Sequence, residues 1–190
     1  MTEQEIAHYV EQNLPTALQA VQSGRRATAH PELTLPDKAL IYHYSDDGYE
    51  ALNRHLHANG GHNTSLFGVG LAAALAKLPP YAGEANSGVY LSPGQLQQYR
   101  TRAQDGQPVS WPAFLSASLR IAIARQYLHA SGKNCLFSIQ SRTGRLIEQI
   151  SKFGVDGQNE YEVLFVPNIQ FEVLEVADEP DCIRIVLDEL

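Results

Sequence analysis

The chain has 190 residues, a formal net charge of −7 at pH 7 and a sequence pI near 5.4. This length suits a single domain with a hydrophobic core, and a composition of 44% hydrophobic and 18% charged residues is typical of a globular protein. The acidic balance argues against a nucleic-acid surface, which needs clustered lysine and arginine, and no apolar run reaches the length of a membrane span. Cys135 and Cys182 lie far apart between apolar residues, so we expect buried free thiols.

The beginning of the chain has the apolar period of helices. Apolar residues recur at intervals of three and four over residues 2–23, with Pro15 as a break, which predicts one or two amphipathic helices. Residues 24–37 lack this period and contain two prolines, so we expect a connector. Residues 2–10 have neither the basic start nor the apolar core of a secretory signal peptide, so we expect any export to use a route without one.

Two further helices are predicted before the sequence changes character. Ser45 suits a helix N-cap, and the helix that follows would bury Leu52 and Leu56 on one face. An alanine-rich helix over residues 66–78 is stopped by Pro79. Three histidines in this region are spaced too loosely to favour a zinc site over ordinary solvated side chains: His55, His57 and His62.

From Tyr81 onward, strand-like segments alternate with turns and with two short helices, predicted at residues 93–102 and 119–128. Apolar segments bounded by glycine, proline and polar residues predict strands at residues 88–92, 111–116, 135–139, 145–150, 160–166, 171–176 and 183–187. Helices first and mostly antiparallel strands afterwards define an α+β fold.

One predicted strand begins with two acidic side chains. Glu160 and Glu162 flank Tyr161 and run into an apolar segment, and strand alternation places the two carboxylates on the same face. Such a pair repels unless a cation, solvent or a proton offsets the repulsion. The pair is therefore either a functional site or a solvated strand end.

Taken in chain order, the motifs resemble those of the arginine-specific mono-ADP-ribosyltransferases, whose signature is an arginine, then Ser-Thr-Ser, then Glu-x-Glu. Ser116-Ala117-Ser118 resembles the Ser-Thr-Ser strand, Glu160-Tyr161-Glu162 the catalytic strand, and residues 151–159 the turn before it. The resemblance extends over about residues 41–176. It implies a mono-ADP-ribosyltransferase-like fold over residues 38–190, with a two-sheet, mostly antiparallel β core, preceded by an N-terminal helical segment and connector, residues 1–37.

The resemblance also implies roles for individual residues, with NAD as substrate. Positive charge develops on the ribose as the nicotinamide bond breaks, and the carboxylate of Glu162 would stabilise it. Glu160 would hydrogen-bond the guanidinium of a target arginine and accept its proton. Ser116 would hold Glu162 or the ribose, unless it is only a strand-end serine bonded to the backbone. This chemistry requires no metal. The implied NAD-binding residues are Tyr90, Leu91, Ser118, Arg120 and Phe153.

One position departs from the family pattern. The first strand of the family ends in an aromatic residue, arginine and glycine, whereas here Tyr90 is followed by Leu91, so we expect Leu91 to replace the arginine that grips the NAD phosphates. Either another cation substitutes, or the site is no longer built for NAD. Arg100, Arg102 and Arg120 are nearby in sequence, and each is equally explained as an exposed, solvated arginine.

Two functions are left open. One is an enzyme that transfers ADP-ribose from NAD to an exposed arginine of a target protein and releases nicotinamide. The other is a catalytically impaired transferase fold whose acidic cleft holds a basic peptide or an arginine side chain of a partner. The enzyme is favoured because both glutamates and the serine are present. By resemblance to bacterial toxins and type III secreted effectors, we expect a secreted virulence effector that acts in the cytoplasm of a host or target cell.

Overall fold

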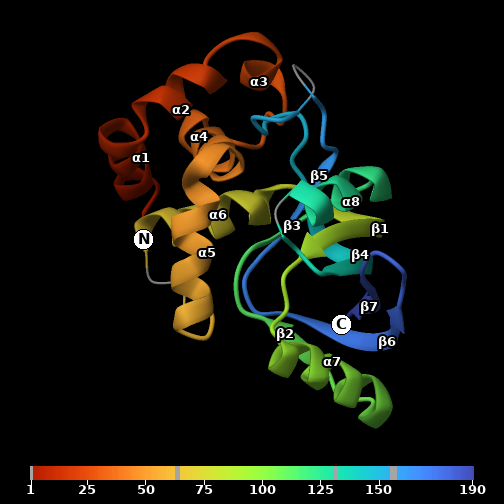
Figure 1. Ribbon diagram of the computed structural model, residues 1–190. Helices are drawn as coiled ribbons and strands as arrows, with labels where there is room; N and C mark the ends of the chain where they lie inside the picture. The colour runs from red at the N-terminus through yellow and green to blue at the C-terminus, as the bar shows by residue number, and fades with distance from the viewer. Residues whose placement is uncertain (1, 63–64, 131, 155–157) are drawn as a thin grey trace.

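The computed structural model describes residues 2–62, 65–130, 132–154 and 158–190. Helices α1 to α6 gather on one side of the molecule, and the strands lie on the other, accompanied by α7 and α8 (Figure 1). This arrangement confirms the predicted α+β class. A single continuous hydrophobic cluster connects the helical part with the sheet, so the two parts share one core.

The helices begin where the sequence supplies caps. Side-chain oxygens of Thr2, Thr34, Ser65 and Ser92 each accept a hydrogen bond from an N–H group in the first turn of the helix that follows. A π-helical turn, η1 (Tyr44–Gly48), joins the fourth and fifth helices. The described helices are α1 (Glu3–Asn13), α2 (Pro15–Val21), α3 (Gly24–Thr28), α4 (Leu35–His43), α5 (Tyr49–Ala58), α6 (Leu66–Lys77), α7 (Pro93–Asp105) and α8 (Ile121–Ala130).

The strands form one hydrogen-bonded sheet with the order β1-β3-β5-β4-β7-β6-β2. All pairings are antiparallel except that of β4 with β7. Because β4 also pairs with β1, the strands β1, β3, β5 and β4 close into a ring. Where two sheets were expected, the seven described strands are therefore joined in one folded sheet: β1 (Pro80–Val89), β2 (Val109–Trp111), β3 (Leu115–Ser118), β4 (Cys135–Leu146), β5 (Glu162–Phe165), β6 (Ile169–Asp178) and β7 (Ile183–Glu189).

The helical part is fastened to the sheet beside β3. The amide of Asn53 on α5 donates to the carbonyl oxygen of Phe114 at 3.1 Å and accepts from the Phe114 N–H at 3.2 Å. The same amide donates to the hydroxyl of the buried Tyr44 at 3.1 Å. These hydrogen bonds fix the distance between α5 and the entry to β3, where Ser116 lies.

The first half of the chain is more helical than the sequence predicted. The expected connector at residues 24–37 contains α3 and the start of α4, and α4 also crosses the expected boundary between residues 37 and 38. Ser45 is not an N-cap, because α4 continues through η1 into α5. Its hydroxyl instead donates to the carbonyl oxygen of Tyr42 at 2.9 Å and accepts from the N–H of Lys152 at 2.8 Å. Tertiary hydrogen bonds thus decide the role of a residue whose local sequence resembles a cap.

Several strand boundaries also differ from the prediction. β1 begins at Pro80 rather than residue 88 and ends at Val89, because its polar first part pairs with β4 irrespective of strand propensity. The segment 111–116 is divided between β2 and β3, which pair with different partners. Residues 145–146 belong to the end of β4, so no separate strand covers residues 145–150.

The two cysteines and the length of the helices bear on the remaining predictions. Cys135 and Cys182 are buried free thiols, as predicted. Within the described ranges, none of the helices combines the length and the apolar character that crossing a bilayer demands.

Leu91 lies in the hydrophobic core directly after β1, and its side chain is 1% exposed. An arginine there would bury a charge without a partner, so we expect Leu91→Arg to lower the free energy of unfolding by about 3 to 5 kcal/mol. Leu91→Met, which keeps the apolar volume, should cost less than about 1.5 kcal/mol. Urea denaturation of the two variants measures the difference, and an arginine variant as stable as the parent would show that this side chain reaches solvent.

Candidate functional site

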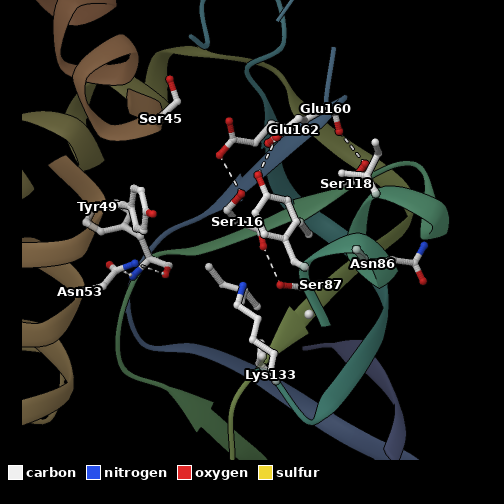
Figure 2. Close-up of a pocket in the computed structure, with 18 of the residues that line it drawn as sticks. Ser45, Tyr49, Asn53, Asn86, Ser87, Ser116, Ser118, Lys133, Glu160 and Glu162 are labelled. Carbon is white, nitrogen blue, oxygen red and sulfur yellow. Dashed lines mark hydrogen bonds between the residues drawn. The ribbon is translucent and has the colours of Figure 1, made fainter. Parts of the chain in front are cut away.

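A cavity of about 720 Å³ lies between the helical part and the sheet. Figure 2 shows Tyr49 and Asn53 of α5 on one wall and Ser116, Ser118 and Ser87 of the sheet across from them. Six of the residues predicted from the sequence line this cavity: Glu160, Glu162, Ser116, Ser118, Tyr90 and Phe153.

Glu162 is the first residue of β5, and its side chain is buried at the wall of the cavity. The hydroxyl of Ser116 donates to Oε1 at 2.7 Å, and the hydroxyl of Ser151 donates to Oε2 at 2.9 Å. Burial raises the pKa of Glu162, while the two hydroxyl donors oppose the shift and the charge of Glu160 adds to it. The site therefore holds a desolvated carboxylate in one fixed orientation.

Glu160 stands beside it in a different environment. Its side chain is half-buried, and the hydroxyl of Tyr127 on α8 donates to Oε1 at 2.6 Å. Its backbone carbonyl accepts a hydrogen bond from Ser118 Oγ at 2.5 Å. Burial and the nearby charge of Glu160 raise the pKa of Tyr127, so Tyr127 stays a proton donor to the carboxylate. Glu160 is thus oriented while part of it still faces the cavity.

The backbone places the two glutamates together in a way that the sequence did not predict. β5 begins at Glu162, so strand alternation does not explain why Glu160 also faces the cavity. Between them, Tyr161 has a φ of 50°, a left-handed conformation that costs a non-glycine residue about 1 to 3 kcal/mol. The side-chain oxygen of Asn159 accepts from the Tyr161 N–H at 2.8 Å and supports this conformation.

Two of the residues predicted to bind NAD do not line the cavity. The prediction that Leu91 contacts NAD is wrong: Leu91 lies two residues beyond the end of β1, and its side chain is buried in the core instead of lining the cavity. The guanidinium carbon of Arg120 lies 3.8 Å from the centroid of the Tyr161 ring, and the guanidinium donates a hydrogen bond to the Tyr161 hydroxyl at 2.6 Å. The strand residues that do reach the cavity from β1 include Asn86, Ser87 and Gly88, and none of these three carries a positive charge.

Several residues of the site were not predicted from the sequence. Ser151, whose hydroxyl donates to Glu162, is the first residue of the predicted turn at residues 151–159 and was not singled out within it. Residues 155–157 of that turn lie outside the described residues. Tyr127 falls in the helix predicted at residues 119–128, and Lys133 lies just before the strand predicted at residues 135–139, yet both line the cavity. Neither carries a local signal, because each reaches the site through the packing of α8 on β1.

The described residues contain no group of three or more histidine, cysteine or acidic side chains arranged to hold a metal ion. The geometry supports chemistry carried by two carboxylates: one buried and fixed by hydroxyls, the other partly accessible and oriented by a phenol. Such a pair can stabilise a developing positive charge and accept a proton close to it.

Comparison with known proteins agrees with this geometry. The sequence profile of a family described as NAD:arginine ADP-ribosyltransferase matches residues 39–190. The chain belongs to this family. It is 31% identical over 167 residues to Mav of Mycobacterium avium (strain 104), an alignment that covers 87% of this chain and 19% of Mav.

A second relative carries a named activity. The chain is 29% identical over 161 residues to Tre1 of Serratia proteamaculans (strain 568), an NAD(+)–protein-arginine ADP-ribosyltransferase, with 83% of this chain and 33% of Tre1 covered. The chain thus spans about a third of Tre1 and about a fifth of Mav. The crystal structure of the ADP-ribosyltransferase HopU1 of Pseudomonas syringae pv. Tomato DC3000 superposes with a TM-score of 0.83 at 15% identity, covering 100% of this chain and 98% of HopU1, which shows that the fold is shared.

The burial of Glu162 predicts a measurable effect on stability. Its folded-state pKa is raised, so ionisation at neutral pH destabilises the folded protein, and this penalty disappears as the pH falls and the carboxylate is protonated. We expect Glu162→Gln to raise the free energy of unfolding at pH 7.5 by about 1 kcal/mol and to raise Tm, with the difference shrinking toward pH 4.

Glu172→Gln on the exposed face of β6 is the matched control, because it removes an equal charge from solvent. It should leave Tm within experimental error at both pH values. A Glu162→Gln variant that is less stable at pH 7.5 would mean that the two hydroxyl bonds outweigh desolvation.

Proposed function

We propose that this chain is an NAD-dependent protein-arginine mono-ADP-ribosyltransferase that moves ADP-ribose from NAD to an arginine side chain of a target protein and releases nicotinamide. The observation that carries the proposal is the buried Glu162 carboxylate, held by Ser116 and Ser151 at the cavity wall beside the more accessible Glu160. Family membership and the named activity of Tre1 support it.

In the proposed reaction, Glu162 acts on the ribose. The bond between the ribose and nicotinamide breaks, its electron pair leaves with nicotinamide, and the ribose gains positive charge. A carboxylate already stripped of water and fixed by two hydroxyls stabilises this charge without reorganising. A cationic substrate also lowers the pKa of Glu162, so binding keeps the group ionised where burial alone opposes ionisation.

Glu160 acts on the acceptor in this proposal. A protonated guanidinium is a poor nucleophile, and a carboxylate that accepts its hydrogen bonds orients one nitrogen toward the ribose. As the new carbon–nitrogen bond forms, the guanidinium nitrogen loses a proton to Glu160. Tyr127 fixes one oxygen of this carboxylate and leaves the other for the acceptor. Tyr90 and Phe153 are exposed aromatic residues at the cavity that would contact the NAD rings.

We further propose that the protein is a secreted bacterial effector that modifies a protein in the cytoplasm of a host or target cell. The bacterial origin of both relatives supports this setting. The N-terminal segment, residues 1–37, is then a helical support for the transferase domain at residues 38–190, because α1 and α2 pack on α4, which leads to the cavity wall at Tyr44.

The proposal predicts different losses for the two glutamates. With an arginine-containing peptide and NAD, we expect Glu162→Gln to reduce both nicotinamide release and peptide modification by about 100-fold or more. Glu160→Gln should reduce peptide modification by about 100-fold and nicotinamide release into water much less, because the acceptor is not involved in hydrolysis. Mass spectrometry of the peptide and a nicotinamide assay separate the two readouts.

Glu172→Gln serves again as the control for a lost surface charge and should retain full activity. If the parent protein neither modifies the peptide nor releases nicotinamide, yet binds the peptide through its acidic cavity, the chain is a binding module with a transferase fold rather than an enzyme.

The hydroxyl of Ser151 predicts a shift in pH dependence. Its hydrogen bond lowers the pKa of Glu162, so Ser151→Ala raises that pKa further, and the acid limb of the kcat/KM profile should move to higher pH. Ser110→Ala, on the exposed side of β2, should leave the profile in place. An acid limb that does not move in Ser151→Ala would show that a group other than Glu162 controls it.

A further inference from the structure

The cavity has an uneven distribution of charge. Four acidic side chains line it: Asp46, Glu50, Glu160 and Glu162. Among the lysine and arginine side chains of the described residues, only that of Lys133 reaches the cavity lining. NAD, the substrate of the proposed function, carries its negative charge on a diphosphate. That diphosphate needs a cation on a surface otherwise dominated by carboxylates.

The arginines considered from the sequence do not supply this cation. Arg100 forms an ion pair with Asp178 at 2.7 Å and does not line the cavity. Arg102 is exposed on the same helix and does not line the cavity. Arg120 is held against Tyr161, outside the lining.

Lys133 is placed for the task by α8 and β1. Its aliphatic stem lies over Gly88, where an added Cβ would come within 3.6 Å of Lys133 Cδ and 2.9 Å of the Ala124 carbonyl oxygen. The glycine is therefore required for the close approach of α8 to the strand, while the lysine stem lies at ordinary contact distance. The Lys133 ammonium lies 5.0 Å from the ring centroid of Tyr127, the residue that holds Glu160. Figure 2 shows the side chain directed toward the middle of the cavity from the end opposite Glu160 and Glu162.

The backbone beside Lys133 is fixed, and its ammonium is available. Asn134 accepts from the Leu91 N–H at 2.9 Å and donates to the Leu91 carbonyl at 2.8 Å, which anchors the segment to the end of β1. Among the described residues, no carboxylate lies within ion-pair distance of the Lys133 ammonium, which faces the ring of Tyr127. Burial lowers the pKa of Lys133, and the charge of Glu160 opposes this shift. An anion bound at the ammonium would offset its desolvation.

We propose that Lys133 binds the diphosphate of NAD, and so supplies from the segment before β4 the cation that the cavity face of β1 lacks. This inference rests on the proposed function, since it names a contact for the same substrate. It assigns the two ends of the cavity different tasks: the carboxylate pair handles the cationic nicotinamide–ribose and the acceptor arginine, and Lys133 holds the anionic middle of the dinucleotide.

Calorimetric binding to the purified chain tests the inference without relying on turnover. The ligands are NAD, ADP-ribose and nicotinamide riboside, which has no phosphate. We expect Lys133→Gln to weaken binding of NAD and ADP-ribose by about 10- to 100-fold while leaving that of nicotinamide riboside unchanged. Lys133→Arg, which keeps the charge, should restore most of the affinity. In turnover assays, Lys133→Gln should raise KM for NAD with little change in kcat.

Arg102→Gln is the matched control, because it removes an equal positive charge outside the cavity, and it should bind all three ligands as the parent does. Thermal denaturation of each variant establishes that it is folded. If the parent binds NAD and Lys133→Gln binds it equally well, the lysine inference is overturned and the proposed function stands. If the folded parent binds neither NAD nor ADP-ribose, the proposed function fails, and this inference fails with it.

Discussion

The site depends on one costly interaction, the burial of an ionisable carboxylate at Glu162. Burying a carboxylate destabilises a fold, and the hydrogen bonds that Ser116 and Ser151 donate from two different segments offset only part of this penalty at Glu162. The same desolvation that costs stability makes the group effective toward positive charge that develops in a transition state. Stability and reactivity at this position are therefore two consequences of one environment.

The sheet and the helical wall hold those donors in place. Within the ring of β1, β3, β5 and β4, Ser116 of β3 pairs with Leu164, two residues after Glu162 on β5, so the register of these strands decides the distance between Ser116 and Glu162. The left-handed Tyr161 then turns the chain so that Glu160 reaches the same cavity from just outside the strand. Asn53 fastens the helical wall to the entry of β3 and fixes the width of the cavity between them. Local strain and tertiary hydrogen bonds together create a geometry that a regular strand would not provide.

The cavity is also organised by charge. Glu160 and Glu162 lie at one end, and Lys133, the single lysine or arginine in the lining among the described residues, extends from the other end. A dinucleotide with a cationic pyridinium and an anionic diphosphate matches this polarity, whereas a purely basic peptide would leave the lysine opposed to a like charge. Tyr127 connects the two ends, because it donates to Glu160 and presents its ring face to Lys133.

The sequence by itself determined what short segments encode: capped helices before a mostly antiparallel sheet, and the order of Ser116-Ala117-Ser118 and Glu160-Tyr161-Glu162 along the chain. These features depend on apolar period, caps and neighbouring residue types, all of which are local. The tertiary structure decided that Leu91 enters the core, that Ser45 is no cap, that Ser151 holds Glu162, and that Lys133 lines the cavity. Each of these outcomes depends on burial or strand pairing between segments distant in sequence. No local pattern records such contacts, because they arise only when the sheet closes and α8 packs on it.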